Sequence, residues 1–130
     1  MNLHSYKPML QSKGTLVGRF LLALLFVSSG FNMLMGGVGN TGMYFDSLGL
    51  PVPVLLAAGV IALKLAAGLA LMAGYKAEEA ALALFVFTGL TILIAHTDTA
   101  DMGLWKNLSI MGGLLYVMAY GPGEGWKLKL

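Results

Sequence analysis

Four long apolar stretches, separated by short polar segments, dominate the hydrophobic pattern of the chain. They run over about 16–36, 53–74, 78–97 and 105–121. A transmembrane helix uses about 20 mostly apolar residues, so these stretches match bilayer crossings in length. Pro51 and Pro53 precede the second stretch, where proline favours a helix start, and Gly121-Pro122-Gly123 ends the fourth. The pattern predicts an all-α membrane protein, in which residues 1–130 form a single four-transmembrane-helix bundle.

The first stretch also permits a different interpretation. Residues 1–29 carry a basic start, an apolar core and the small residues Ser28 and Ser29, followed by Gly30, which resembles a signal peptide. Cleavage there would leave three spans. The apolar character continues through Met35, which favours a membrane span that is retained.

Composition excludes an ordinary soluble enzyme. The chain is 58% hydrophobic and 11% charged, with a mean hydropathy of +0.80, whereas a soluble domain has about 45–50% apolar and about 25% charged residues. Four spans fill most of the 130 residues, so any chemistry must lie among the helices or on short loops. The absence of cysteine excludes disulfides, thiolate metal sites and iron–sulfur clusters within this chain.

The basic residues predict the orientation of the bundle. The N-terminal segment, the 75–77 connection and the C-terminal segment share one side, which holds Lys7, Lys13, Arg19, Lys76, Lys127 and Lys129. The other side holds Lys106 together with Asp46, Asp98 and Asp101. Because cytoplasmic loops are enriched in lysine and arginine, both termini are expected on the cytoplasmic side of a bacterial-type inner membrane. The basic residues form no cluster of the kind that binds nucleic acid.

Lys64 is the most unusual polar residue, because it lies near the middle of the second stretch. An ionisable group at the centre of a span costs about 2.5–3.5 kcal/mol on translocon scales and indicates function by default. Helical spacing places it opposite a stripe of small residues: Ala58, Ala62, Ala66, Ala70 and Gly74. Its lysine stem could snorkel or reach a backbone carbonyl. Alternatively, its ammonium could bind an anion, a quinone carbonyl or a carboxylate of a partner.

Two further groups are candidates for binding. Arg19 lies near the predicted cytoplasmic end of the first span, where it could anchor the helix or pair with Glu78 or Glu79. His96 closes the third span, beside Asp98, Asp101, Lys106 and Asn107. This set could relay protons or hold a quinone head, or it could form a solvated loop network. No metal site is expected, because the set lacks a second inward histidine and a recognised ligand spacing.

The chain resembles the DoxX family of small four-helix membrane proteins. The segments that carry the resemblance are Gly18-Arg19-Phe20-Leu21-Leu22, Ser29-Gly30-Phe31-Asn32, Tyr44-Phe45-Asp46-Ser47-Leu48-Gly49-Leu50-Pro51, Gly68-Leu69-Ala70-Leu71-Met72-Ala73-Gly74-Tyr75, His96, Leu104-Trp105-Lys106-Asn107-Leu108-Ser109 and Tyr120-Gly121-Pro122-Gly123. The family's polar positions correspond here to Arg19, Asn32, His96, Lys106 and Asn107. The sequence departs from the family pattern twice, with Met33 in place of a lysine and Lys64 in place of a glutamate.

This resemblance implies a function in a membrane oxidoreductase system, since such proteins are associated with thiosulfate:quinone oxidoreductase and related redox complexes. The expectation is an integral membrane subunit with a quinone as its candidate cofactor. The alternative is a non-catalytic accessory or scaffolding subunit of a larger membrane complex. In either case the partners would be the lipid bilayer and other membrane subunits or further copies of the chain. Solute transport is disfavoured, because the spans lack the broken helices of many transporters.

Overall fold

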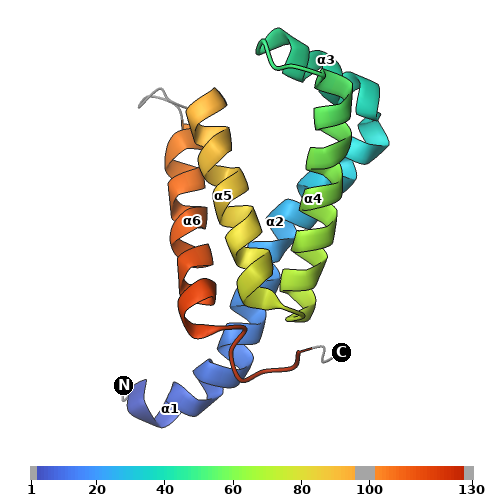
Figure 1. Ribbon diagram of the computed structural model, residues 1–130. Coiled ribbons are helices and arrows are strands. Elements are labelled where there is room, and N and C mark those ends of the chain that lie inside the picture. Colours follow the sequence, from blue (N-terminus) through green and yellow to red (C-terminus); the bar gives the residue numbers. More distant parts are fainter. Residues whose placement is uncertain (1–2, 96–101, 128–130) are drawn as a thin grey trace.

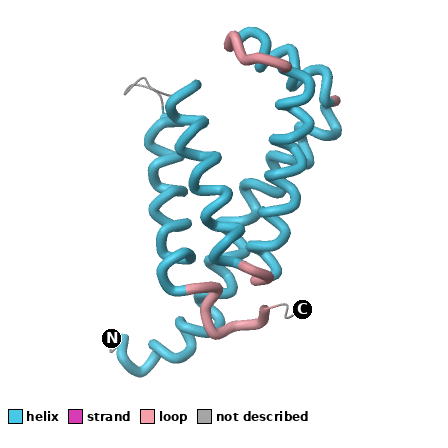
Figure 2. Tube along the Cα trace, viewed as in Figure 1, coloured by secondary structure: helices cyan, strands magenta, loops and turns pink. Residues whose placement is uncertain are grey.

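The computed structural model describes residues 3–95 and 102–127, which form helices, turns and no strand. The elements are α1 (Leu3–Met9), a π-helical turn η1 (Leu10–Gly14), α2 (Thr15–Gly36), α3 (Val38–Ser47), α4 (Pro53–Ala73), α5 (Ala77–Ala95) and α6 (Met102–Tyr120). Figures 1 and 2 show long helices running roughly side by side, with short connections at their ends. The all-helical class predicted from the hydrophobic pattern is therefore confirmed for the described residues.

Three helical segments are long and apolar enough to cross a membrane: Ser5–Gly36, Pro53–Ala73 and Ala77–Ile94. Helix α6 has the same length as α5, 19 residues, but it is not one of the three. Lys106 and Asn107 in its first turns lower its mean hydropathy. The fourth crossing and the cytoplasmic placement of the termini therefore stay predictions.

The long helices form two pairs. Helix α2 packs against α4, and α5 packs against α6, whereas α2 and α6 make little contact. At one end, the turn between α4 and α5 holds the pairs together; we call this the closed end, and it also carries the start of α2 and residues 121–127. At the opposite, open end, α3 caps the α2–α4 pair, and the two pairs diverge (Figure 1).

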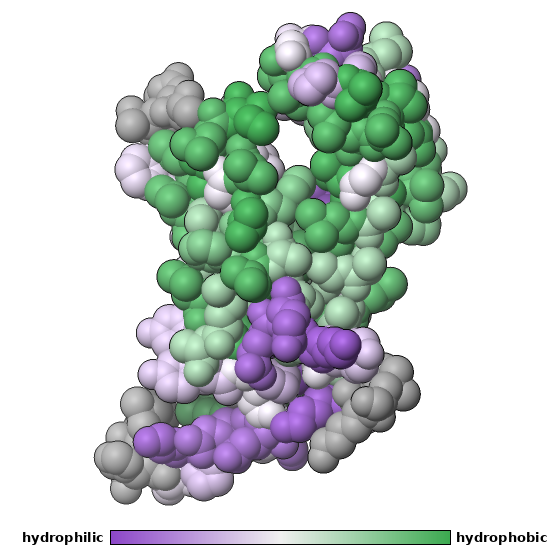
Figure 3. Space-filling view, viewed as in Figure 1, coloured by the Kyte–Doolittle hydropathy of each residue, from purple (hydrophilic) through white to green (hydrophobic). Residues whose placement is uncertain are grey.

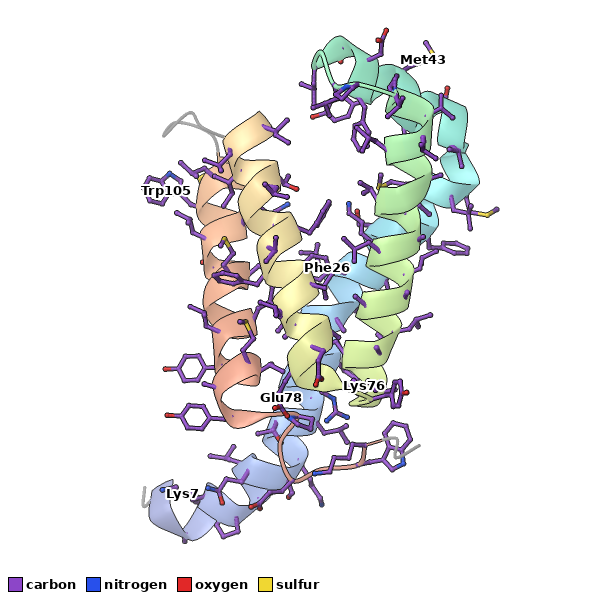
Figure 4. All side chains as sticks on the ribbon, in the orientation of Figure 1. Lys7, Phe26, Met43, Lys76, Glu78 and Trp105 are labelled. Atoms are coloured by element: carbon purple, nitrogen blue, oxygen red, sulfur yellow. The ribbon has the colours of Figure 1, made fainter. Side chains whose placement is uncertain are left out.

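The hydrophobic core lies in the half of the bundle next to the closed end. It consists of Ala23, Phe26, Ala67, Leu71, Ala77, Ala80, Ala81, Leu84 and Leu114. More than half of these side chains are alanine, and small side chains let helix backbones approach closely where apolar burial gives little drive in lipid. Phe26 points from α2 toward the space between the pairs (Figure 4). This cluster of buried apolar side chains thus lies in one half of the molecule, while Ala57 and Ile61 of α4 are buried nearer the open end.

Two glycines set the crossing of α2 and α4. A Cβ on Gly68 would lie 2.9 Å from Cγ2 of Val27, and a Cβ on Gly30 would lie 3.0 Å from Cβ of Lys64. The backbones therefore approach as closely as side chains allow. One consequence is that the middle of α4, including Lys64, is held directly against α2.

The small-residue stripe of α4 is largely turned away from the rest of the chain. Ala58, Ala62 and Ala66 are exposed, whereas the buried face of the helix carries Ala57, Ile61, Ala67, Gly68 and Leu71. The helix therefore uses the neighbouring face for packing within the chain. The exposed alanines are free to face lipid or another helix.

Helix α3 was not predicted from the hydrophobic pattern. It follows Gly37, whose φ of 99° is strained for any other residue and redirects the chain at the end of α2. Gly42 then packs against the start of α4, where a Cβ would lie 2.9 Å from Cγ2 of Val54. This ten-residue helix is too short and too polar to register as a hydrophobic stretch, although it forms one wall of the open end.

Candidate functional site

Lys64 is half-buried and contacts side chains of the neighbouring helices α2 and α5. Its Nζ donates a hydrogen bond to Oγ of Ser29 at 2.8 Å and contacts Sδ of Met33 at 3.4 Å. The same Nζ lies 5.5 Å from the centre of the Phe87 ring, a cation–π arrangement. These partners come from α2 and α5, and none of them carries a charge. The lysine is therefore held by neutral groups from both helix pairs.

Two pockets meet at Lys64. The first, which we call the wedge pocket, has a volume of about 620 Å³ and lies between the α2–α3–α4 side and α5. Its walls are mainly apolar, with Met33, Phe45, Leu56 and Leu90 among them. Figure 3 shows an opening between the two helix pairs near the open end, bordered by hydrophobic surface. The wedge pocket is thus suited to an apolar molecule.

The second pocket, which we call the polar cavity, has a volume of about 180 Å³. Its polar lining residues are Ser29, Lys64, Thr88, Thr91, Lys106 and Asn107. Lys64, Phe87 and Thr91 line both pockets, so the two are contiguous. An apolar space therefore leads directly to a small space that holds two lysines and an amide.

Most of the residues predicted to bind a ligand lie around these two pockets. Asn32 lines the wedge pocket, Lys106 and Asn107 line the polar cavity, and Lys64 lines both. His96 lies outside the described residues, as do Asp98 and Asp101. Chain positions more than 70 residues apart, in α2 and α6, are thereby brought to one region of the open half.

Arg19 lies away from the wedge pocket and the polar cavity, and its contacts stabilise the fold. It is only 3% exposed and lies at the closed end. Its Nε donates to the carbonyl oxygen of Met72 at 3.3 Å, and its two terminal nitrogens donate to those of Pro122 at 2.8 Å and Trp126 at 2.5 Å. A guanidinium has five N–H donors, which suits several carbonyl acceptors at once. Arg19 therefore fastens α2 to the end of α4 and to the C-terminal segment.

The turn after α4 is shaped to admit this arginine. Gly74 ends α4 with a φ of 75°, and a Cβ at that position would lie 3.0 Å from Cζ of Arg19. Glu78, which the sequence offered as an ion-pair partner, is exposed and lies with Lys76 at the closed end (Figure 4). The structure assigns main-chain carbonyls as the acceptors of the guanidinium.

The sequence did not indicate that Ser29 contacts Lys64. Serine and threonine hydroxyls within membrane helices commonly donate to backbone carbonyls of the same helix. Thr88 and Thr91 do so, donating to the carbonyls of Leu84 at 2.7 Å and Phe87 at 3.0 Å. Ser29 instead accepts a hydrogen bond from Lys64. Only the crossing point of α2 and α4 reveals this, because nothing in the sequence pairs positions 29 and 64.

These features define a class: a small, all-helical integral membrane protein with a lysine-lined cavity between two helix pairs. Residues 14–97 match the family model described as DoxX. Inner membrane protein YqjF of Escherichia coli (strain K12) is 35% identical over 118 residues, covering 88% of each chain. Inner membrane protein YphA of the same organism is 32% identical over 117 residues, covering 83% of each. The chain belongs to the DoxX family.

The comparisons confirm two predictions. The resemblance drawn from the sequence is correct, and the expected location in an inner membrane agrees with the relatives and with the three helices that can span a bilayer. No solved structure matches the chain.

Proposed function

We propose that this protein is the ligand-binding membrane subunit of an oxidoreductase system and that its ligand is an amphipathic molecule such as a quinone. One observation carries the proposal: Lys64 lies at the junction of the apolar wedge pocket and the polar cavity. A lysine in the middle of a span is costly, so its presence there favours a function. At this junction, Lys64 can bind the head group of a ligand whose apolar part occupies the wedge pocket.

The pockets supply what such a ligand needs. Binding pockets are typically about 300–1,000 Å³, mostly apolar, with a few convergent polar groups, and the wedge pocket of about 620 Å³ lies in that range. Lys64, Lys106 and Asn107 can donate hydrogen bonds to the oxygens of a head group. Asn32 offers a further amide within the wedge pocket. The body of the ligand would lie between the helix pairs, with its head at Lys64.

Binding can be tested by calorimetric titration of a short-tailed benzoquinone into the full chain in lipid nanodiscs. We expect Lys64→Met to weaken the affinity at least about tenfold, which corresponds to about 1.4 kcal/mol. Lys76→Met is the matched control, because Lys76 is exposed at the closed end. Equal affinities of the wild type and Lys64→Met would reject Lys64 as the binding group.

The association with an oxidoreductase is tested separately. A tagged chain, extracted gently from its native membrane, is expected to co-purify with a redox-active subunit such as a dehydrogenase or a cytochrome. Purification of the chain alone, with unchanged quinone reduction in membranes that lack it, would contradict this part of the proposal.

We also propose that α6 is a fourth crossing and that the closed end faces the cytoplasm. The segments at the closed end carry five basic residues, Lys7, Lys13, Arg19, Lys76 and Lys127. The open end carries Lys106. This asymmetry follows the usual distribution of lysine and arginine. The two helices α5 and α6 also pack along each other, which supports a crossing of similar depth.

The absence of cysteine makes this topology easy to test. Single cysteines are placed at the exposed positions Met43, Lys76 and Tyr120. In intact cells, an impermeant maleimide should label Met43→Cys and should label Lys76→Cys and Tyr120→Cys only after permeabilisation. Labelling of Tyr120→Cys together with Met43→Cys, but not Lys76→Cys, in intact cells would reject the fourth crossing.

A non-catalytic accessory subunit is the second candidate, favoured by the exposed alanines of α4. Ala58, Ala62 and Ala66 offer a narrow surface on which a helix of another subunit could pack closely. Ala62→Phe should then remove a partner that co-purifies with the wild type. Leu115→Phe, which changes an exposed residue on α6 rather than on α4, should retain that partner. Retention of the partner by both variants would reject this surface.

A further inference from the structure

Two cations share the polar cavity. Lys64 enters it from the middle of α4, and Lys106 enters it from the first turns of α6. The other polar groups in the lining are the hydroxyls of Ser29, Thr88 and Thr91 and the amide of Asn107. Among the described residues that line the cavity, none is acidic. Within residues 3–95 and 102–127, the lining thus carries two positively charged side chains and no carboxylate.

Positive charges placed together repel each other, and the repulsion grows where water is excluded. Within a span, ionisable groups usually face a partner of opposite charge or a backbone carbonyl. Lys64 has instead a hydroxyl, a thioether and an aromatic ring as its contacts. Lys106 is exposed, whereas Lys64 is half-buried. A ligand with a negative charge would pair with the half-buried Lys64 and could also be reached by Lys106 from the same cavity.

The hydrogen-bond donors of the site also suit an anion. Lys64 has three N–H donors, of which Ser29 and Met33 occupy two, so one remains for a ligand. Lys106 and the Asn107 amide add further donors around the same space. The hydroxyls of Thr88 and Thr91 already donate to main-chain carbonyls. Lys64, Lys106 and Asn107 are therefore the groups that can hold an anionic head.

The sizes of the two pockets indicate which one can hold the polar head of a ligand and which one can hold its apolar body. A water molecule occupies about 30 Å³ in the liquid, so the polar cavity of about 180 Å³ has room for a small head with a few waters. The larger, apolar wedge pocket joins it at Lys64 and has room for an aliphatic or aromatic body. The division between a small polar space and a large apolar space matches a single-tailed amphiphile.

We propose that the site binds an anionic amphiphile, with a carboxylate head between Lys64 and Lys106 and an apolar tail in the wedge pocket. This inference rests on the binding site proposed above and specifies the charge of the ligand. A quinone carries oxygen acceptors without a net charge, so it satisfies the same donors but gains no charge–charge attraction to Lys64 and Lys106.

The test compares three ligands on the full chain in neutral-lipid nanodiscs at pH 8: dodecanoate, dodecanol and a short-tailed benzoquinone. Dodecanoate and dodecanol have the same tail length, so their difference reports the head group. We expect dodecanoate to bind at least tenfold more tightly than dodecanol. Lys64→Met and Lys106→Met should each reduce dodecanoate affinity at least tenfold, whereas Lys76→Met should not change it.

Lys64→Arg is a second variant that separates loss of charge from loss of folding, because it keeps the positive charge at position 64. It should retain most of the dodecanoate affinity that Lys64→Met loses, while both variants elute as the wild type does in size-exclusion chromatography. Loss of binding in Lys64→Arg equal to that in Lys64→Met would overturn the role of charge.

The outcomes separate this inference from the proposed function. Equal binding of dodecanoate and dodecanol, or binding of the quinone without dodecanoate, would overturn the anionic head and leave the amphipathic site standing. Binding of dodecanoate without the quinone would support the inference and reject the quinone as ligand. If none of the three ligands bound, the site itself would be rejected, and the inference with it.

Discussion

The two halves of the bundle differ in how closely their helices pack. Near the closed end, alanines and leucines pack into a dry core, and Arg19 ties three segments together. Near the open end, the helix pairs diverge, and the space between them forms the wedge pocket and the polar cavity around Lys64. The difference shows that basic residues within the helices can serve different purposes: Arg19 holds the fold through three carbonyls, whereas Lys64 contacts only neutral side chains beside two pockets.

Replacement of the arginine should produce the largest loss of stability. Arg19→Met leaves the carbonyls of Met72, Pro122 and Trp126 without their donor, and hydrogen bonds to charged groups contribute about 1.5–3 kcal/mol each. Because the three are not additive, we expect a loss of about 3 kcal/mol. The measurement is unfolding in mixed micelles by circular dichroism, with Lys13→Met, an exposed residue, as control. A change below that of the control would place the stability of the closed end elsewhere.

A matched pair of leucines on α4 should separate the halves more directly. Leu71 is fully buried in the core, whereas Leu56 is 36% exposed and lines the wedge pocket. Leu71→Ala leaves a cavity among packed neighbours and should cost about 2 kcal/mol. Leu56→Ala enlarges a space that already exists and should cost much less. Equal losses in the same unfolding measurement would show that the open half is as tightly packed as the closed half.

The smallest effect on stability should come from the lysine. Lys64→Met removes one hydrogen bond to Ser29 and also removes the cost of an ammonium within the bundle. Replacing a buried charge by an apolar residue of similar volume is often neutral or stabilising. We therefore expect the unfolding free energy to stay within about 1 kcal/mol of the wild type. A loss as large as that of Arg19→Met would make Lys64 a second structural anchor.

The hydrophobic pattern predicted the all-helical class because long apolar stretches are local features. It singled out Lys64 for the same reason, since one charge among apolar residues is visible in the sequence. It could not find Ser29 or Phe87 as partners of Lys64, because those contacts depend on where α2, α4 and α5 cross. The carbonyl acceptors of Arg19 were equally hidden, because every residue carries a carbonyl.

Helix α3 escaped prediction because its stability comes from packing on α4 rather than from its own composition. Gly42 allows that packing, and a glycine in a polar segment reads as a loop signal in a sequence. The relative positions of Asn32, Lys106 and Asn107 likewise follow from the way the helix pairs diverge. The sequence thus indicated which polar residues to inspect, and the arrangement of helices showed which of them share a space.

The hydrogen bonds of Arg19 have a consequence for biosynthesis. The arginine enters the membrane with the first long helix, but two of its acceptors, at Pro122 and Trp126, lie 103 and 107 residues further along the chain. Until the ribosome has made those residues, the guanidinium lacks two of its three partners. The first helix to be inserted therefore gains two of its arginine's acceptors only when the C-terminal segment is translated. In a nascent chain stalled before residue 122, Arg19 would lack the acceptors at Pro122 and Trp126.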